Sequence, residues 1–522
     1  MGRMPVIIPR PMKMEGKKGF FTFTSATRIV AEPGLAAAAE FLASRLRPAT
    51  GFPLPIEKGG VGNAPSGCVL LSGSRDGGWN PGDEGYELET GPEGIALRAS
   101  AAAGAFYGAQ TIRQLLPLEI EKTKRVRGVA WKVPSGSISD APRYPWRGLL
   151  LDSCRHFMTK KFVKRYIDLL AYHKLNRLHW HLTEDQGWRL EVDKYPELTQ
   201  IGAWREGKGG KYGGFYTKAD VREIVEYAAG RHVMVVPEIE MPGHCQSALA
   251  AYPELSCTGG PFKVGTEWGV YKDVYCAGND AVFGFLENVL SEVLELFPAP
   301  YVHIGADEVP KDRWKACPKC QERIRNEGLR DEFALQTYFV ARIAKFIQAR
   351  GKKVICWDEV LEGGAPPGVI VQAWRGHEPG ARAVEAGSEV IVSPYTHVYL
   401  DYGVDYNGLR KVLSFDPVPA GLSPEGSAHI IGTEGLIWTE GAPQHTVDSK
   451  VFPRLGGVAE VAWSPVLGKD WPEFSARSRA HCERLRLMGV DVGPADEAER
   501  RARERKKPSR RRKSSKRGRR RG

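Results

Sequence analysis

The 522-residue chain lacks several features that would assign it to a class at once. It has no run of about 18 apolar residues, so the sequence predicts no membrane span. The first 21 residues are basic but contain neither an apolar core nor a small-residue cleavage site, so we expect no secretory signal. We therefore predict a cytoplasmic protein unless a leader has been removed.

Cysteines are few, and their positions are scattered. They occur at positions 68, 154, 245, 257, 276, 317, 320, 356 and 482, an odd number in a long chain, which does not indicate a disulfide framework. Cys317 and Cys320 have C-x-x-C spacing, but no second pair follows at the spacing of a zinc site. For this pair we favour structural thiols over a local disulfide or a metal or redox role. The sequence predicts no metal site and no cofactor.

Most of the chain has little net charge. The formal charge is +12, but residues 500–522 hold fifteen Lys or Arg against the single acid Glu504, which gives 15 − 1 = +14. Residues 1–499 therefore carry 12 − 14 = −2. The basic tail contains too little apolar surface to bury, so we predict disorder. It suits an acidic partner, such as nucleic acid or an anionic membrane surface, or alternatively serves as a solvated end.

Composition divides the chain into four segments. Residues 1–18 are rich in proline and lysine and are predicted to be a poorly ordered leader. Residues 19–142 alternate apolar runs with alanine-rich helical stretches, which predicts a small α+β domain. Prolines near residue 142 mark the boundary with a catalytic unit over residues 143–492. Residues 493–522 form the tail.

Eight short apolar segments follow one another between residues 146 and 438, and each ends in polar or aromatic residues. The predicted strands are Arg147–Asp152, Arg177–Leu182, His232–Glu238, Tyr301–Gly305, Lys353–Trp357, Val369–Trp374, Glu389–Ser393 and His429–Trp438. Amphipathic stretches separate most of them, and a last helix is predicted over Phe474–Met488. Eight strand-then-helix units predict a closed (β/α)₈ TIM barrel. An open doubly wound sheet should carry a glycine-rich phosphate turn after an early strand, and the sequence has none there.

The predicted strand ends are rich in histidine, tryptophan and carboxylates. Asp307 and Glu308 follow the fourth strand. Side chains at the C-terminal end of a barrel converge on one site, so these residues are expected to meet. Each alone has an ordinary explanation, such as a helix cap. Several tryptophans beside several carboxylates are typical of sugar sites, because pyranose faces pack on aromatic rings and hydroxyls bond to carboxylates.

Eight segments, in order, resemble the family-20 glycoside hydrolases, the β-N-acetylhexosaminidases. The segments are WRGLLLDSCRHF, NRLHWHLTEDQGWRLE, PEIEMPGH, HIGADEVP, WDEV, VQAW, YLD and LIWTE, and the resemblance covers roughly residues 20–490. It implies an exo-acting enzyme that removes terminal β-linked GlcNAc or GalNAc with retention. In such enzymes the substrate's own acetamide is the nucleophile. The implied partner is a HexNAc-terminated oligosaccharide or glycoconjugate.

The resemblance assigns roles to the catalytic positions. Glu308 is implied to be the general acid, and Asp307 to accept the acetamide N–H and stabilise the oxazolinium intermediate. Tyr399 is implied to donate to the acetamide carbonyl oxygen. His244 is expected behind Glu308, in a relay with Glu184. Burial and the Asp307 charge should raise the pKa of Glu308 while Asp307 stays ionised, so activity should fall above neutral pH.

The same resemblance implies a set of sugar-binding residues. Those expected to hold hydroxyls or to wall the pocket are Arg155, Asp401, Glu440, Trp357, Trp374 and Trp438. Two loops, around Gly207–Tyr216 and Gly259–Tyr275, are long enough to shape the acceptor side. The residues do not distinguish GlcNAc from GalNAc, the natural aglycone or the oligomeric state.

Two positions depart from the family pattern. Ala306 stands where the family usually has glycine, so an extra methyl group lies in the turn before the acidic pair. Glu184 occupies a position that is commonly Asp, and its longer side chain makes Asp185 an alternative relay carboxylate.

Two functions from other classes also fit parts of the sequence. His179-x-His181, with Asp307 as a third ligand, resembles the metal pair of barrel amidohydrolases. A chelator that abolished activity would favour that function. A non-catalytic sugar-binding protein, or one tethered to nucleic acid, should lack the general acid, whereas Glu308 is present.

Overall fold

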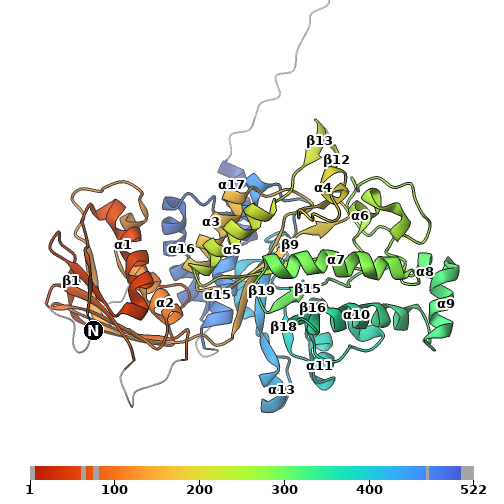
Figure 1. The fold of residues 1–522 in the computed structure, drawn as a ribbon. Coiled ribbons are helices and arrows are strands. Elements are labelled where there is room, and N and C mark those ends of the chain that lie inside the picture. Colours follow the sequence, from red (N-terminus) through yellow and green to blue (C-terminus); the bar gives the residue numbers. More distant parts are fainter. Residues whose placement is uncertain (1–5, 60–65, 75–81, 208, 466–469, 507–522) are drawn as a thin grey trace, which may run out of the picture.

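A small mixed sheet and a larger barrel lie side by side in a computed structural model of the chain (Figure 1). The structure describes residues 6–59, 66–74, 82–207, 209–465 and 470–506. No helix within these ranges is both long enough and apolar enough to cross a membrane.

The first unit is a seven-stranded sheet that carries two helices. Its strand order is β1 (Lys13–Thr22), β7 (Lys132–Asp140), β5 (Tyr86–Gly91), β6 (Gly94–Ala99), β4 (Cys68–Ser72), β2 (Arg28–Ala31) and β3 (Ile56–Lys58). Helix α1 (Ala36–Thr50) buries Ala39, Leu42, Ala43 and Leu46, one stripe of helical period. Helix α2 (Ala102–Leu115) packs closely on the sheet, because a Cβ on its Gly108 would lie 2.2 Å from the Leu97 side chain.

The structure differs from the predicted leader at residues 6–18. Ile7 and Ile8 are buried, and the Ile8 backbone N–H donates to Gln114 Oε1 at 2.9 Å. Strand β1 begins at Lys13 and pairs with β7. The partners of this segment lie more than 100 residues away, so local composition could not indicate them. Residues 1–5 of the predicted leader lie outside the described residues.

The second unit is a closed barrel of eight parallel strands, which confirms the predicted TIM barrel. The strands, in order around the barrel, are β8 (Trp146–Asp152), β9 (Arg177–His181), β14 (Met234–Glu238), β15 (Tyr301–His303), β16 (Lys353–Trp357), β17 (Val369–Ala373), β18 (Val390–Val392) and β19 (Ile430–Ile437). Each overlaps one predicted strand. The longer helices around them are α3 (Lys160–Tyr172), α5 (Lys218–Ala229), α7 (Asp280–Leu296), α10 (Glu332–Gln348), α11 (His377–Glu385), α15 (Arg454–Trp463) and α16 (Trp471–Leu487).

Buried ion pairs fasten the small sheet to the barrel. Arg147, at the start of β8, is fully buried and donates to Glu84 of the first unit at 2.8 and 2.9 Å. Lys174, just before β9, lies 2.6 Å from Asp140 at the end of β7. Both contacts lie at the N-terminal ends of barrel strands, away from the ends where barrel enzymes keep their sites.

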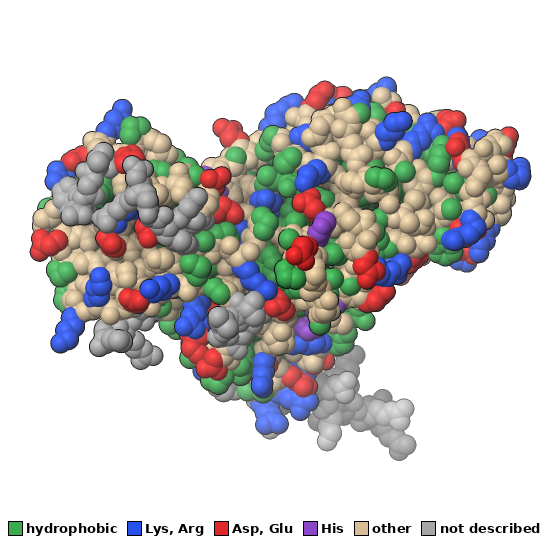
Figure 2. Space-filling model, turned by 90° about the horizontal axis from the view of Figure 1, so that it is seen from below, with side chains coloured by type: hydrophobic (Ala, Val, Ile, Leu, Met, Phe, Trp, Pro, Cys, Tyr) green, Lys and Arg blue, Asp and Glu red, His purple; other side chains and the backbone are tan. Residues whose placement is uncertain are grey.

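The start of the predicted disordered tail is helical. Helix α17 (Glu497–Lys506) places glutamates four residues from arginines, as in Glu499–Arg503, and such pairs stabilise a helix. Arg503 also donates to the Val492 and Gly493 carbonyls. The prediction of disorder is wrong for this helix, and residues 507–522 lie outside the described residues. On the face shown in Figure 2, acidic and basic side chains are interspersed, in keeping with the nearly neutral charge of residues 1–499.

Candidate active site

A cavity of about 180 Å³ opens at the C-terminal ends of the barrel strands. Among the described residues, those that line it all come from the barrel unit: Arg155, Asp307, Glu308, Trp357, Trp374, Tyr399, Asp401, Tyr402, Trp438 and Glu440. All of them except Tyr402 are residues that the sequence predicted for the site. The other two predicted residues, His244 and Glu184, lie behind the acidic pair.

A left-handed turn presents the acidic pair to the cavity. After β15 the φ angles are +66° at Gly305, +75° at Ala306 and +48° at Glu308. Glycine suits position 305 because of its φ angle and because a Cβ there would lie 1.7 Å from Glu240 Oε2, a side chain that would have to move. Ala306 carries a Cβ in a region that disfavours one, at a cost of about 1–2 kcal/mol. Strained backbone of this kind occurs frequently at functional sites.

His244 connects the acidic pair to two buried carboxylates. Its Nδ1 lies 2.8 Å from Glu184 Oε1 and 3.2 Å from Asp185 Oδ2, so both alternative relay carboxylates contact it. Its Nε2 faces Glu308 Oε2 at 3.6 Å and Asp307 Oδ2 at 3.7 Å. Burial opposes a charge here, but Glu184 and Asp307 outweigh it and raise the pKa of His244 well above its usual value. We infer that His244 is a cation.

The pKa shifts of the two carboxyls are the reverse of those expected from the sequence. Interaction with His244 lowers the pKa of Glu308, whose side chain is 44% exposed. Burial raises the pKa of Asp307 to about 6, and its side chain is only 15% exposed. The expectation of a raised pKa for Glu308 is therefore wrong for the free protein, whereas a pKa of about 6 leaves Asp307 mostly ionised at neutral pH. The reason is that Glu308 lies near solvent, whereas Asp307 lies at the floor of the pocket.

One oxygen of Asp307 has no hydrogen-bond donor in the described part of the chain. Its Oδ1 is buried, and no hydrogen-bond partner for it exists among the described residues. An N–H group brought to this oxygen would favour the carboxylate form. A proton displaced from Asp307 could then reside on Glu308, as general acid catalysis requires.

Arg155 and Asp401 both line the cavity, and each has charged neighbours. Arg155 Nη2 lies 2.9 Å from Glu184 and 3.9 Å from Glu440, and its guanidinium lies 4.9 Å from the Trp438 ring. Burial raises the pKa of Asp401 to about 7, and its Oδ1 has no partner in the described part of the chain. These groups are placed to donate to, and accept from, a bound polar ligand.

Five aromatic rings line the cavity, and four of them are residues that the sequence predicted for the site. Ring centroids lie 6.0 Å apart for Trp357 and Trp438, 6.3 Å for Trp374 and Tyr399, and 6.4 Å for Tyr399 and Trp438. Tyr399 is fixed by a backbone bridge to Leu436 of β19. Together the rings form an apolar cage beside the acidic pair, a surface suited to a methyl group and a sugar face.

Sequence reasoning missed two residues of the site. Tyr402 lines the cavity, and its ring centroid lies 5.7 Å from that of Tyr399. Glu359 accepts from Trp374 Nε1 at 3.0 and 3.2 Å and orients that indole. Burial, together with Asp307, raises the pKa of Glu359 to about 8. A signal was available for each, since Glu359 lies in the WDEV segment and Tyr402 directly follows YLD.

His179 and His181 do not form an open metal pair with Asp307. His179 contacts Glu434 at 2.7 Å and Glu238 at 3.2 Å, and His181 also hydrogen-bonds to Glu238. Despite burial, Glu238 and its neighbours raise the pKa of His179 to about 10 and that of His181 to about 9. Both imidazoles are thus engaged by buried carboxylates of neighbouring strands, an arrangement that favours an internal ion-pair network.

A larger groove adjoins the cavity. It measures about 940 Å³, and both long loops line it, with Tyr212 from one and Trp268 from the other. Glu440 lines both spaces, so a ligand held in the cavity can extend into the groove. The Arg205 guanidinium lies 4.9 Å from each of the two rings and helps to hold them in place.

Two family models match the chain. "Glycosyl hydrolase family 20, catalytic domain" matches residues 144–466, and "Glycosyl hydrolase family 20, domain 2" matches residues 4–141. A β-hexosaminidase of Porphyromonas gingivalis is 43% identical over 500 residues, which cover 93% of this chain and 64% of that protein.

Solved structures of similar proteins have the same fold. The β-N-acetylhexosaminidase of Streptomyces coelicolor A3(2) is 36% identical with a TM-score of 0.82, over 93% of this chain and 97% of that one. A mutant β-hexosaminidase of Streptomyces plicatus, solved with the product GlcNAc, is 35% identical with a TM-score of 0.83, over 94% of this chain and 97% of that one.

Proposed function

This chain belongs to glycosyl hydrolase family 20, and we propose that it is an exo-acting β-N-acetylhexosaminidase that removes terminal β-linked GlcNAc or GalNAc. The observation that carries the proposal is the pairing of Asp307 and Glu308 within an aromatic cage. The buried Asp307 oxygen needs an N–H donor, and the cage suits a methyl group. A 2-acetamido sugar supplies both in one substituent.

The first step forms a bond between the acetamide oxygen and C1 of the same sugar. Asp307 accepts the acetamide N–H, and Tyr399 donates its hydroxyl hydrogen to the acetamide carbonyl oxygen. That oxygen attacks C1 while Glu308 donates its proton to the glycosidic oxygen, so the C1–O bond breaks and the aglycone leaves. The product is an oxazolinium ion, whose positive charge the Asp307 carboxylate stabilises.

The second step reverses the role of Glu308. Its carboxylate removes a proton from water, and the water oxygen attacks C1 as the C1–O bond of the oxazolinium opens. Two displacements at C1 leave the configuration retained. Sugar binding covers Glu308 and excludes water, and desolvation of this kind favours the neutral acid that the first step requires.

Arg155, Asp401 and Glu440 bind the hydroxyls of the terminal sugar in this proposal. Arg155 is held by Glu184, so its guanidinium keeps a fixed direction at the cavity mouth. The groove beside Glu440 receives the remainder of the glycan, and Trp268, which is 44% exposed, offers an aromatic face to a second sugar.

Hydrolysis of nitrophenyl β-GlcNAc and nitrophenyl β-GalNAc tests the proposal. The wild type should cleave at least one of them, and Glu308→Gln should lose about 100-fold or more in kcat/KM, as removal of a general acid does. Glu295→Gln, an exposed position on α7, is the matched control and should keep full activity. An inactive wild type or a fully active Glu308→Gln would refute the assignment.

A second probe isolates the acetamide mechanism. A thiazoline mimic of the cyclised intermediate should inhibit competitively, because it places a ring nitrogen where it can share a proton with Asp307, and a methyl group in the cage. Hydrolysis that continues unchanged in the presence of the mimic would eliminate the acetamide as nucleophile, even for an active enzyme.

A further inference from the structure

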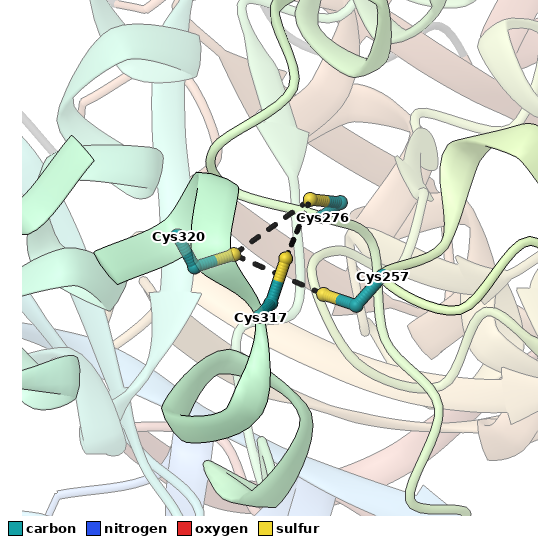
Figure 3. A group of neighbouring side chains, drawn as sticks. All are labelled: Cys257, Cys276, Cys317 and Cys320. Atoms are coloured by element: carbon teal, nitrogen blue, oxygen red, sulfur yellow. Dashed lines mark hydrogen bonds between the residues drawn. The ribbon is translucent and has the colours of Figure 1, made fainter. Parts of the chain in front are cut away.

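Four cysteines that are distant in the sequence meet at the base of the loop that carries Trp268. Cys257 and Cys276 belong to the segment between α6 (Gln246–Ala251) and α7, and Cys317 and Cys320 lie at the start of α9 (Pro318–Asn326). Their sulfurs point toward one another (Figure 3). The Sγ–Sγ distances are 3.8 Å for Cys257–Cys320, 3.7 Å for Cys276–Cys317 and 3.7 Å for Cys276–Cys320.

These distances match the edges of a tetrahedron around a metal ion. A Zn–S bond measures about 2.3 Å, and two ligands of a tetrahedral zinc are then about 3.8 Å apart. A disulfide would need about 2.05 Å. The Cys276 sulfur lies equally far from Cys317 and Cys320, and all four sulfurs lie within 4.8 Å of one another. The cluster therefore has the geometry of four ligands around one centre.

The backbone around the cluster brings the two pairs together closely. An antiparallel β-bridge between Ser256 and Tyr275 joins the two ends of this segment, and each bridged residue directly precedes one cysteine, Cys257 or Cys276. A Cβ on Gly278 would lie 2.2 Å from the Lys319 carbonyl oxygen, so only glycine permits this approach to the C-x-x-C turn. Cys276, Cys317 and Cys320 are buried, which shields the sulfurs from solvent.

We propose that Cys257, Cys276, Cys317 and Cys320 form a structural zinc site. Four thiolates complete the tetrahedron and leave no position for water or substrate, as in structural rather than catalytic zinc sites. Binding of one Zn²⁺ releases the four thiol protons. None of the four cysteines lines the cavity or the adjoining groove in the described part of the chain, so hydrolysis does not use the metal.

The metal would fix one wall of the groove. The loop between Cys257 and Cys276 carries Trp268, and its polar contacts include the Gly265 N–H to Asp185 carbonyl hydrogen bond at 2.9 Å and the Arg313–Asp273 ion pair at 2.8 Å. Zinc would anchor both ends of this loop to α9. Any effect of zinc on glycan binding in the groove rests on the proposed function. The presence of the zinc site does not depend on that function.

The sequence prediction of no metal site rested on the absence of a second C-x-x-C pair. The second pair comes earlier in the chain, and 18 residues separate its members. No local spacing rule identifies such a pair, because the β-bridge and the approach of α9 bring the four sulfurs together.

Elemental analysis of the full chain, purified under reducing conditions without added chelator, tests the site. We expect one zinc per chain in the wild type and in Cys482→Ser, a control at a buried cysteine outside the cluster. Cys317→Ser/Cys320→Ser should lose the zinc and melt at a lower temperature. Absence of stoichiometric zinc, or another metal in its place, would overturn the assignment.

Two further measurements keep the proposal falsifiable if the double variant does not fold. Wild-type protein grown with Co²⁺ in place of zinc should show the intense visible absorption of tetrahedral thiolate-bound cobalt. The mass of the non-reduced, denatured chain should correspond to nine free thiols. A mass lower by about 4 Da, which indicates two disulfides, or a colourless cobalt-grown protein would refute the zinc site, whatever the outcome of the hydrolysis assays.

Discussion

Replacement of His244 by glutamine removes a buried cation that faces both carboxyls of the proposed catalytic pair. His244 Nε2 lies 3.7 Å from Asp307 Oδ2 and 3.6 Å from Glu308 Oε2. Glutamine can still donate to Glu184, which also keeps Arg155 and His181 as partners. The substitution therefore changes the charge beside the pair while the carboxylates behind it stay paired.

The distance sets the size of the expected effect. Two unit charges 3.7 Å apart interact by about 1.1 kcal/mol in the dielectric of water and by about 4.5 kcal/mol at an effective dielectric of about 20. One pH unit corresponds to about 1.4 kcal/mol. Asp307 is only 15% exposed, so the real value lies above the water limit. We expect a shift of at least about one pH unit.

The sign follows from the proton that the pair shares. Above the pKa of Asp307, about 6, the pair has lost its last proton, and Glu308 has none to donate. In the wild type, kcat/KM should therefore fall as pH rises through about 6. The cation stabilises the ionised pair, so the proton is held to higher pH without it. The alkaline limb of His244→Gln should move upward, to about pH 7 or above.

The assay is kcat/KM for nitrophenyl β-GlcNAc, measured from about pH 4 to pH 9 to cover both limbs. His429→Gln is the matched control, because it removes an imidazole at the N-terminal end of β19, away from the site. The alkaline limb of its pH profile should not move. Melting temperatures establish that both variants fold. A His244→Gln limb that stays in place, or moves to lower pH, would refute the electrostatic coupling.

Three further substitutions test the backbone, the interface and the cage. Ala306→Gly should raise the free energy of unfolding by about 1 kcal/mol in thermal melts, because glycine adopts φ +75° at little cost; an unchanged or lower melting temperature contradicts this. Lys174→Met leaves the Asp140 charge buried without its cation and should cost about 3–5 kcal/mol in urea unfolding; a loss below about 1 kcal/mol would show that this pair contributes little. Tyr399→Phe should lower kcat about 100-fold with little change in KM, since the hydroxyl acts on the developing charge; an unaltered kcat removes that role.

Local pattern was sufficient where the structure repeats along the chain. Each barrel strand is a short apolar run, and most are followed by an amphipathic helix. The parallel barrel joins such units in sequence order, so eight strands could be recognised one at a time. The site residues followed from the same regularity, because every strand end points to one cavity. Trp357, the last residue of β16, is one example.

Local pattern was not sufficient where the environment comes from distant parts of the chain. Ile8 is buried because it packs against Leu409 and Phe474 of the barrel unit, although residues 1–18 as a whole are rich in proline and lysine. The order of protonation at Asp307 and Glu308 depends on which side chain faces solvent and how near His244 lies, and adjacent positions in sequence cannot show either.

The sequence by itself determined the class of fold and the chemistry of the pocket. Hydrophobic period, segment length and the residue types at strand ends are local properties, and a barrel brings all of its C-terminal strand ends to one cavity. The tertiary structure alone decided the order of protonation in the acidic pair and the meeting of the four cysteines. Electrostatic energy and metal geometry depend on distances through space, and two residues far apart in sequence, such as Cys257 and Cys320, are brought within 3.8 Å only by the folded chain.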